Sequence, residues 1–429
     1  MTIEAVGVAP ELRLDVEFVD GLDQHADVVR EELQQGLVHL SGRRLGADGA
    51  AELRLDHVER RLGVRPPVVV GQKLVALELV VDRPVADLYM GDALDAYEHW
   101  PTPATIVSDG AYGVGGFPGD PRTPDGLHEW YEPHVAAWSR RAHPSTTLWF
   151  WNTEIGWATV HPLLVENGWE YVQTITWDKG ISHVAGNVNG DTIRQFPVAT
   201  EICVFYRRRL EMPSGDGTMM MVGKEWLRHE WLRAGLRLSE ANTACGVKNA
   251  ATRKYLTQDW LWYWPPPEMM ERLAKYANKH GRPTGRPYFS LDGKKPVTAQ
   301  EWAALRDKWT HQHGMTNVWS HPPLNGEERF RGNGVRSAPR VHSPGKNATV
   351  HLNQKPVEFM RRIVTASTQP GDVLWEPFGG LCSAVVAAVE LGRAGYAAEP
   401  IKHFFDLAVE RVAIAEKAVV KSARAECTE

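Results

Sequence analysis

The sequence has few cysteines and no long apolar run. Its four cysteines, Cys203, Cys245, Cys382 and Cys427, are scattered, with neither the paired spacing nor the nearby histidines that a zinc site needs. We therefore expect reduced thiols and no metal. No apolar run approaches the roughly 20 residues that span a bilayer, and the first residues carry acids rather than the basic segment of a signal peptide. These absences predict a soluble, cytoplasmic protein with no membrane partner.

The charges are unevenly distributed along the 429 residues. Residues 224–346 hold 21 Lys and Arg against 11 Asp and Glu, whereas the rest of the chain holds 27 against 42. The net charge of −5 does not by itself favour nucleic acid, but this asymmetry predicts a basic lobe on an acidic body. A polyanion would bind to such a lobe. A solvated, lysine-rich surface is the alternative.

Residues 86–210 alternate between short β-like runs and helix-like stretches. The β-like runs include ATIVSDGAYG, TTLWFWN and EICVFYRRR, and GLHEWYEPHVAAWSRR is a helix-like stretch between them. This alternation predicts an α/β sheet. Residues 1–85 carry no motif with evident chemistry. The segment EMPSGDGTMMM, rich in turn-forming residues, predicts a linker after the sheet.

The region after this linker differs in composition and predicts a mostly helical unit. Eight of the seventeen tryptophans lie between residues 226 and 319. Within it, LRLSEANTACGVKNAATRKYLT is typical of a helix-turn-helix, with Ser239 capping a helix over 240–245, a turn at Gly246 and a second helix over 249–256. A plain packing motif is the alternative. The exposed side chains expected to face DNA are Lys248, Asn249, Arg253 and Lys254.

Two further stretches of this basic region remain open to two interpretations each. The aromatic run Trp260 to Trp264 suits core packing better than stacking on displaced bases. The Gly- and Arg-rich stretch that contains Arg329 and Arg331 either clamps the DNA backbone or forms a loop that orders on DNA.

The unit GDVLWEPFGGLCSAVVAAVELGRAGYAAEP predicts a strand, a glycine turn, a helix and a second strand. The first strand delivers Glu376 to the carboxyl edge of a parallel sheet, where open α/β sheets bind ligands. Gly379 and Gly380 allow close approach of the backbone. Glu399 follows about twenty residues later and is suited to ribose hydroxyls. This pattern suits an adenosyl cofactor, although a structural glycine turn is the alternative.

A short loop, Asp109-Gly110-Ala111-Tyr112, follows the apolar run TIV. A carboxylate that precedes an aromatic ring by three residues can hold a planar base with an exocyclic amine. Asp109 and the carbonyl of Ala111 would accept the two amine hydrogens, and Tyr112 would stack on the ring. An Asp-Gly turn with a half-buried tyrosine is the structural alternative.

Taken together, these segments resemble the beta-class, circularly permuted, S-adenosylmethionine-dependent amino-methyltransferases of DNA. In that family a D-P-P-Y loop comes first, target recognition follows, and D-P-F-x-G-x-G-T comes last; Asp109 to Tyr112 and Glu376 to Ser383 keep this order. Three other segments resemble family motifs. Tyr89 to Asp92 resembles the G-D segment, and Trp177 to Gly180 resembles the W-x-K segment. His351 to Pro356 resembles the H-P-x-Q-K-P segment. A fourth, Gly392 to Glu399, resembles G-R-x-x-x-G-x-E.

The resemblance implies a Rossmann-like methyltransferase sheet, circularly permuted, with an inserted helical target-recognition domain. It divides the chain into an N-terminal extension (1–85), a target-base half (86–210), a basic helical region (211–316) and a cofactor half (317–429). It also implies double-stranded DNA as substrate and direct methyl transfer, and it leaves open a cognate restriction endonuclease and a homodimer as partners. The cofactor contacts that it implies are Asp92, Lys355, Glu376, Phe378, Gly380 and Glu399.

The chain departs from the family pattern at both prolines of the target loop, and by Glu376 and Cys382 in the cofactor loop. Without fixed proline φ angles, the stiffness of the target loop has to come from elsewhere. The resemblance links an aspartate at the head of the loop to adenine N6 as the acceptor, and a serine there to cytosine N4. A loop that starts at Ser108 would favour cytosine N4. An RNA methyltransferase and an inactive DNA-binding protein are the alternatives from other classes.

Overall fold

The structure is a computed structural model, and it describes residues 86–181, 194–257, 260–324, 329–330 and 354–426. Nearer the N terminus it describes four short strands, in two antiparallel pairs. In these pairs β1 (Leu12–Arg13) lies beside β4 (Val80–Val81), and β2 (Ser41–Arg43) lies beside β3 (Ala76–Glu78). The rest of the predicted N-terminal extension lies outside the described residues.

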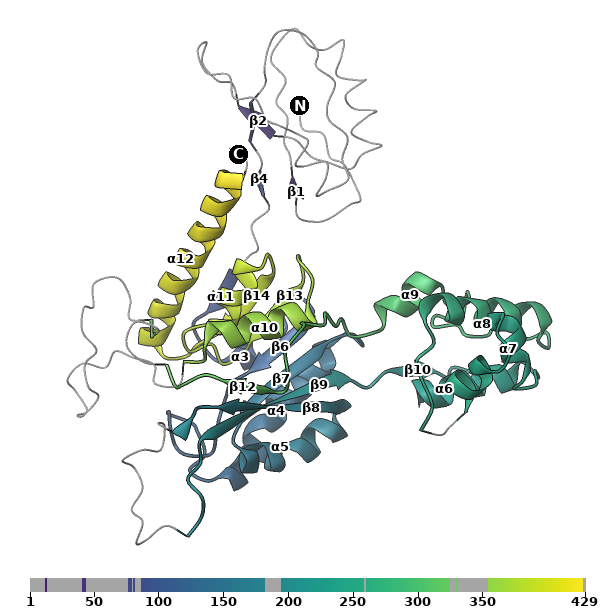
Figure 1. Cartoon of the computed structure of the whole chain (residues 1–429), viewed down its shortest axis with the longest axis horizontal. Coiled ribbons are helices and arrows are strands. Elements are labelled where there is room, and N and C mark those ends of the chain that lie inside the picture. The colour runs from purple at the N-terminus through teal and green to yellow at the C-terminus, as the bar shows by residue number, and fades with distance from the viewer. Residues whose placement is uncertain are drawn as a thin grey trace.

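An eight-stranded sheet forms the centre of the molecule, in the order β12-β8-β9-β7-β6-β13-β14-β5 (Figure 1). Strand β9 runs antiparallel to both of its neighbours, and the other described pairs of this sheet are parallel. The predicted α/β sheet is confirmed. The strands are β5 (Ala86–Tyr89), β6 (Thr105–Ser108), β7 (Thr147–Asn152), β8 (Trp169–Asp178), β9 (Thr200–Arg208), β12 (Val318–Ser320), β13 (Val373–Glu376) and β14 (Ala394–Ala398).

Helices cover both faces of this sheet, which is why the run TLWFWN of β7 is buried along its whole length. Alternate side chains of β7 enter the two opposite cores: Trp149 packs in one and Leu148 in the other. One face carries α10 (Val357–Ser367), α11 (Ser383–Glu390) and α12 (Lys402–Glu426). The other carries α3 (Ala93–Ala96), the 3₁₀ turn η1 (Pro124–Gly126), α4 (Leu127–Arg141) and α5 (Glu154–Glu166).

The strand order brings the target loop (Asp109 to Tyr112) and the cofactor loop (Glu376 to Ser383) to one edge of the sheet. Strands β13 and β14 come last in the chain, yet they lie between β6 and β5. Because these four strands are parallel, their carboxyl ends lie at one edge of the sheet, the carboxyl edge. Four acids lie at or just after these strand ends: Asp109, Glu376, Glu399 and Asp92. The antiparallel β9 begins at this edge, so Glu201 near its start lies there as well.

Residues 211–306 form a separate helical lobe with its own core around Trp226, Trp231 and Trp302. The segment expected to be a linker is instead a hairpin, with Met212 opposite Met221. A polar Ser214–Asp216 turn closes this hairpin, because the Ser214 hydroxyl donates to Asp216. The elements of the lobe are β10 (Glu211–Pro213), β11 (Met220–Val222), α6 (Gly223–Arg233), α7 (Glu240–Cys245), η3 (Thr252–Leu256), α8 (Pro267–His280) and α9 (Ala299–Ala304).

The predicted helix pair is present in the lobe. Helix α7 has the expected bounds and ends at Gly246 with φ of 70°, and a second helical segment runs over 250–256. The predicted cap was wrong. The Ser239 side chain makes no capping hydrogen bond, because its backbone is already helical, and Glu240 accepts from the Arg237 N–H at 2.7 Å instead.

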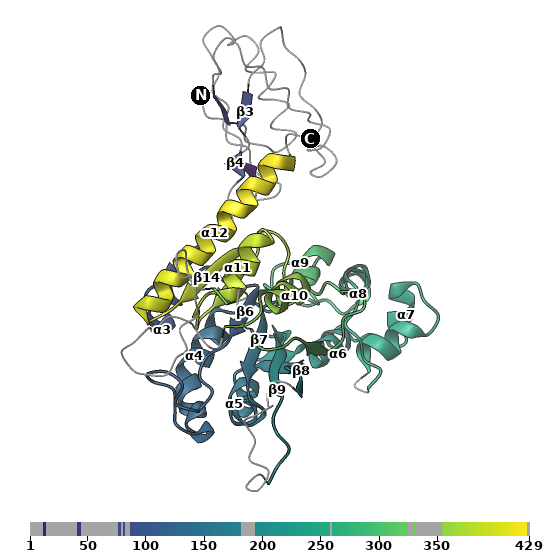
Figure 2. The same ribbon diagram turned by 60° about the vertical axis from the view of Figure 1, so that its left-hand side comes forward.

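The lobe docks at the edge of the sheet opposite to Asp109. A cavity of about 220 Å³ lies between the lobe and the sheet. It is lined by Trp262 and Trp264 of the lobe and by Arg207 and Arg208 at the end of β9. In both views the lobe lies on the opposite side from the start of α12 and from α3, which follow the carboxyl ends of β14 and β5 (Figure 1, Figure 2).

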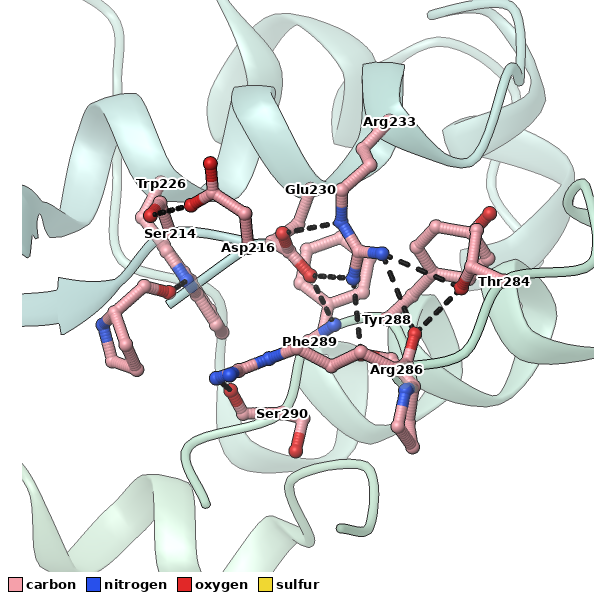
Figure 3. Close-up of polar contacts among 12 residues, drawn as sticks. Ser214, Asp216, Trp226, Glu230, Arg233, Thr284, Arg286, Tyr288, Phe289 and Ser290 are labelled. Atoms are coloured by element: carbon pink, nitrogen blue, oxygen red, sulfur yellow. Dashed lines mark hydrogen bonds and ion pairs between the residues drawn. The ribbon is translucent and has the colours of Figure 1, made fainter. Parts of the chain in front are cut away.

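A buried ion pair ties the lobe together (Figure 3). Arg233 donates to both oxygens of Glu230, at 2.8 and 2.6 Å, and the Glu230 side chain is only 2% exposed. Glu230 also accepts from the Phe289 N–H, and Arg233 donates to the Pro287 carbonyl. Phe289 holds a φ of 54°, so the pair fixes a strained segment next to α8.

Breaking this ion pair should make the lobe less stable. Arg233→Met should lower the free energy of unfolding by about 3 kcal/mol, because the Glu230 charge stays buried without its partner. Arg233→Met/Glu230→Gln should recover most of this loss. Urea denaturation followed by tryptophan fluorescence measures both. Arg140→Met, which removes an exposed pair with Glu98, should have a negligible effect. Equal losses in the single and double variants would contradict this interpretation.

Candidate active site

The target loop begins where β6 ends. Ser108 is fully buried in the sheet, whereas the side chain of Asp109 is 17% exposed. Gly110 packs directly on the cofactor loop, because a Cβ at this position would lie 2.6 Å from the Phe378 ring and 2.8 Å from the Tyr131 hydroxyl. A proline does not fit here. The first departure from the family loop is therefore a packing requirement of this chain.

Ala111 is held by two buried donors. Its carbonyl accepts from the Tyr131 hydroxyl at 3.1 Å and from Asn152 Nδ2 at 2.9 Å. Asn152 ends β7, and Gly156 leaves room for it, since a Cβ there would lie 1.9 Å from Asn152 Oδ1. These bonds supply the stiffness that the absent prolines would have given. They also occupy both lone pairs of the carbonyl that was expected to receive an amine hydrogen.

Asp109 and Tyr112 belong to a compact cluster with two residues from distant parts of the chain. Lys355 Nζ lies 2.7 Å from Asp109 Oδ1 and 3.0 Å from Glu201 Oε1. The Tyr112 hydroxyl lies 2.9 and 2.6 Å from the same two oxygens, between which it shares its one hydrogen, and it accepts from Lys355 at 3.1 Å. The Lys355 ammonium also lies 5.3 Å from the centre of the Tyr112 ring. The two carboxylates are thus bridged twice.

A second lysine completes the charge balance of the cluster. Lys179 lies 2.8 Å from Glu201 Oε2 and 4.7 Å from the centre of the Trp177 ring. Both residues belong to the segment that resembles W-x-K. The cluster therefore holds two carboxylates and two ammonium groups.

The pKa shifts of the cluster follow from burial and from these contacts. Burial raises the pKa of Asp109, and the nearby Lys355 offsets this only in part. Burial would also raise the pKa of Glu201, but Lys355 and Lys179 lower it to about 2. Although burial opposes its charge, Lys355 has a raised pKa because it lies between Asp109 and Glu201. Glu201 stays ionised and Lys355 stays protonated near neutral pH.

The cofactor loop is built on a buried carboxyl group. Glu376 ends β13, and its Oε2 accepts from the Val385 N–H at 2.8 Å, at the start of α11. Burial raises its pKa to about 8, against the backbone N–H groups and the charge of Arg411. Arg411 in turn donates to the Leu381 carbonyl and to the Ser383 hydroxyl.

Glu399 holds the glycine turn beside it. Its two oxygens accept from the N–H groups of Gly380 and Ile401, each at 2.8 Å. The Gly91 N–H donates to the Glu399 carbonyl, which brings the following Asp92 to the same edge. Asp92 itself is exposed and caps α3 by accepting from the Leu94 N–H.

Phe378 lies against a cluster of aromatic side chains from α4. Its ring centre is 4.9 Å from that of His134 and 5.1 Å from that of Trp130. Because Phe378 also touches Gly110, this ring joins the cofactor loop to the target loop. An aromatic lining of this kind fits a planar base such as an adenine ring.

Cys382 stands where the family has a glycine, and its backbone shows why glycine is preferred there. Its φ of 51° lies in the left-handed region, at the start of α11. A non-glycine residue in that region costs on the order of 1 kcal/mol. The thiol is buried and packs near Gly379, so this departure tightens the cofactor loop.

A family model described as DNA methylase matches residues 104–410, which is more than half of the chain. The chain belongs to the DNA methylase family.

Individual relatives are similar over shorter stretches. The Type II methyltransferase M.BglII of Bacillus subtilis is 36% identical over 62 residues, which are 14% of this chain and 17% of the relative. The DNA adenine methyltransferase YhdJ of Escherichia coli (strain K12) is 26% identical over 142 residues, which are 32% of this chain and 48% of the relative. The chain thus spans less than half the length of these two relatives. The solved complex of M1.HpyAVI with SAM is 14% identical, with 76% of this chain and 100% of that chain covered at a TM-score of 0.37.

S-adenosylmethionine is the methyl donor of this family, and the residues of this methylase fit it. Glu399 keeps free lone pairs for ribose hydroxyls beside Gly380, and Phe378 and Trp130 offer aromatic surface for the adenine ring. Five of the six predicted cofactor residues gather around the ends of β5, β13 and β14. Lys355 differs, because only its backbone meets the cofactor loop, through a 3.1 Å bond from the Ser383 hydroxyl.

The residues predicted to contact DNA lie apart from this site. The side chains of Lys248, Asn249, Arg253 and Lys254 are exposed on the helical lobe, at the other edge of the sheet. Arg329 lies near the carboxyl edge, since the next residue, Phe330, donates its N–H to Gln354 beside Lys355, while Arg331 lies outside the described residues. The structure therefore does not join these groups into one surface.

The aromatic run of the methylase divides between core and surface. Trp262 and Trp264 pack against the core of the lobe, as predicted, but Trp260 is 87% exposed. Three of the cysteines are free and buried, in agreement with the predicted thiols, and Cys427 lies outside the described residues.

Several residues of the site were missed by the motif search. Glu201, Asn152 and Tyr131 belong to no quoted family segment, although each has a polar group fixed in a buried position. An acid at the head of the apolar run EICVFY was the available signal for Glu201. In the part of the chain that the structure describes, no helix is long and apolar enough to cross a membrane, and no metal-ligand cluster occurs.

The raised pKa of Glu376 makes a pH-dependent contribution to stability. Between its ordinary pKa of 4.5 and about 8, the folded state keeps a proton that the unfolded state has lost. The free energy of unfolding should therefore fall as the pH rises through this window, by more than about 1 kcal/mol. Urea denaturation from pH 5 to 8.5 measures it, and Glu376→Gln should make the slope shallower. An equal slope in both proteins would contradict the shift.

Proposed function

We propose that this chain is a site-specific DNA methyltransferase that methylates the exocyclic amine of a flipped base, preferably adenine N6. The observation that carries the proposal is Asp109, a partly exposed carboxylate fixed at the carboxyl edge beside the loop of Glu376 and Gly380. Its Oδ1 accepts from Lys355 and Tyr112, while Oδ2 accepts no hydrogen bond from the described residues. This leaves one acceptor oxygen for an incoming amine.

The other groups of the loop complete the acceptor site. Because the Ala111 carbonyl already holds two donors, we assign the second amine hydrogen to the carbonyl of Gly110, which has no donor among the described residues. The half-buried Tyr112 ring offers a stacking face. S-adenosylmethionine supplies an electrophilic methyl group, and the protein contributes mainly by holding the base amine in position.

Two observations support adenine over cytosine. Ser108 is fully buried inside β6, so the exposed loop opens at Asp109 and not at the serine. The relative with the longer match is named a DNA adenine methyltransferase. Cytosine N4 is the alternative acceptor.

The arrangement of parts also supports the beta class and a DNA-reading lobe. The target loop precedes the cofactor loop in the chain, and the lobe interrupts the path between β9 and β12. We propose that Lys248, Asn249, Arg253 and Lys254 contact double-stranded DNA. Because the lobe and Asp109 lie at opposite edges, a second copy of the chain is well suited to bring a lobe to the bound DNA. The restriction endonuclease partner and the cytoplasmic location stay predictions from the sequence.

The role of Asp109 is tested by Asp109→Ala. Methyl incorporation into DNA should become undetectable, because the amine loses its acceptor, while binding of S-adenosylmethionine by calorimetry should stay within about twofold. Glu170→Ala, on a partly exposed side chain at the other end of the sheet, serves as the control and should retain full activity. Methylation by Asp109→Ala would refute the assignment. If the unaltered protein binds S-adenosylmethionine and DNA but does not methylate, the alternative that it is an inactive DNA-binding protein is favoured.

The role of the lobe is tested with Lys248→Ala/Arg253→Ala/Lys254→Ala. Three fewer phosphate contacts should weaken DNA binding and reduce the slope of log K against log salt by about 2 to 3. Fluorescence anisotropy over a range of salt concentrations measures both. Lys417→Ala/Lys421→Ala, further along α12, removes exposed charge away from both the lobe and the cofactor loop and should leave the slope unchanged. Equal slopes for the triple variant and the unaltered protein would rule out the lobe as the DNA reader.

A further inference from the structure

Glu201 is a buried carboxylate that touches the target loop without belonging to it. It enters from the antiparallel strand β9, and its side chain is only 10% exposed. Its Oε1 contacts Lys355 Nζ at 3.0 Å and the Tyr112 hydroxyl at 2.6 Å, and these are the two groups that hold Asp109 Oδ1. We propose that Glu201 is a positioning residue for the target amine, acting on Asp109 through Lys355 and Tyr112. This inference rests on the methyl transfer proposed above.

The geometry explains how Glu201 selects one oxygen of Asp109. Lys355 and Tyr112 each lie between Asp109 Oδ1 and Glu201 Oε1, so these four polar atoms form a closed ring of contacts. Two shared donors fix the plane of the Asp109 carboxylate more tightly than a single ion pair would. Oδ2 is then the oxygen that faces the amine. Without Glu201, Lys355 and Tyr112 lose their second anchor and the Asp109 carboxylate can rotate.

Glu201 also sets the charge around the amine. With both carboxylates ionised, Asp109, Glu201, Lys355 and Lys179 sum to zero. Without Glu201, Lys355 and Lys179 against Asp109 would leave a net charge of +1 beside a nitrogen that becomes more positive as it takes a methyl group. In a buried site such a charge acts strongly. Glu201 cancels it, and Lys179 keeps Glu201 ionised from the solvent side.

The test replaces Glu201 by glutamine, which keeps its size and removes its charge. Glu201→Gln should lower kcat for DNA methylation by about 100-fold, the cost of a misplaced reacting group. The affinity for S-adenosylmethionine, measured by calorimetry, should stay within twofold. Glu170→Gln, a strand glutamate paired with Arg207 at the opposite edge, is the matched control and should leave kcat unchanged.

The pH profile separates a positioning role from a merely structural one. Methylation needs ionised Asp109, so kcat should fall on the acid side as this carboxyl takes a proton. Glu201 raises the pKa of Asp109 and Lys355 lowers it. The acid limb should therefore move to lower pH in Glu201→Gln and to higher pH in Lys355→Met. If Glu201→Gln does not fold, as its melting temperature would show, the same readout comes from Glu201→Gln/Lys179→Gln, which also removes the Glu201 charge.

A charge-matched double variant completes the experiment. Glu201→Gln/Lys179→Gln returns the cluster to zero net charge and should regain at least tenfold in kcat over Glu201→Gln. Unaltered kcat and an unmoved acid limb in folded Glu201→Gln would overturn the inference. A failure of the proposed function is distinct, because the unaltered protein would then incorporate no methyl group at all.

Discussion

The site at the carboxyl edge of the sheet is held together by one buried ammonium group. Lys355 lies between Asp109 and Glu201, which come from strands that run in opposite directions and are far apart in the chain. Each contact alone would cost more in desolvation than it gains, but three acceptor contacts and two aromatic faces compensate the charge. The ammonium thereby joins the target loop to the segment that leads into the cofactor half, so the two halves form one site.

The departures from the family pattern are explained by packing around this edge. Gly110 allows Phe378 and Tyr131 to approach the backbone, and Tyr131 with Asn152 then holds Ala111 in place of proline rings. Cys382 keeps the left-handed turn at some cost in strain. The loop that looked most altered in sequence is thus among the most firmly held parts of the site.

Much of the fold was predictable, because periodicity and turn residues are local. Short patterns of apolar residues and glycine predicted strands β6 to β9, helices α4 and α7, and the β13–α11–β14 unit. The hairpin at 211–222, the docking of the lobe at the far edge and the bridging of Asp109 by Lys355 were not predictable. The last two depend on contacts between residues far apart in the chain, 246 positions in the case of Lys355 and Asp109. Motif order located Lys355 but could not tell which loop its side chain would meet.

The central claim, that Asp109 presents an amine of a DNA base to the methyl donor, is tested most directly by identifying the modified nucleoside. Double-stranded DNA from methylation-free bacteria, incubated with the protein and S-adenosylmethionine carrying a labelled methyl group, is digested and analysed by mass spectrometry. The account predicts labelled N6-methyldeoxyadenosine. Labelled N4-methyldeoxycytidine would keep the amine chemistry and correct the base. DNA that stays unlabelled while the protein binds both DNA and S-adenosylmethionine would contradict the account.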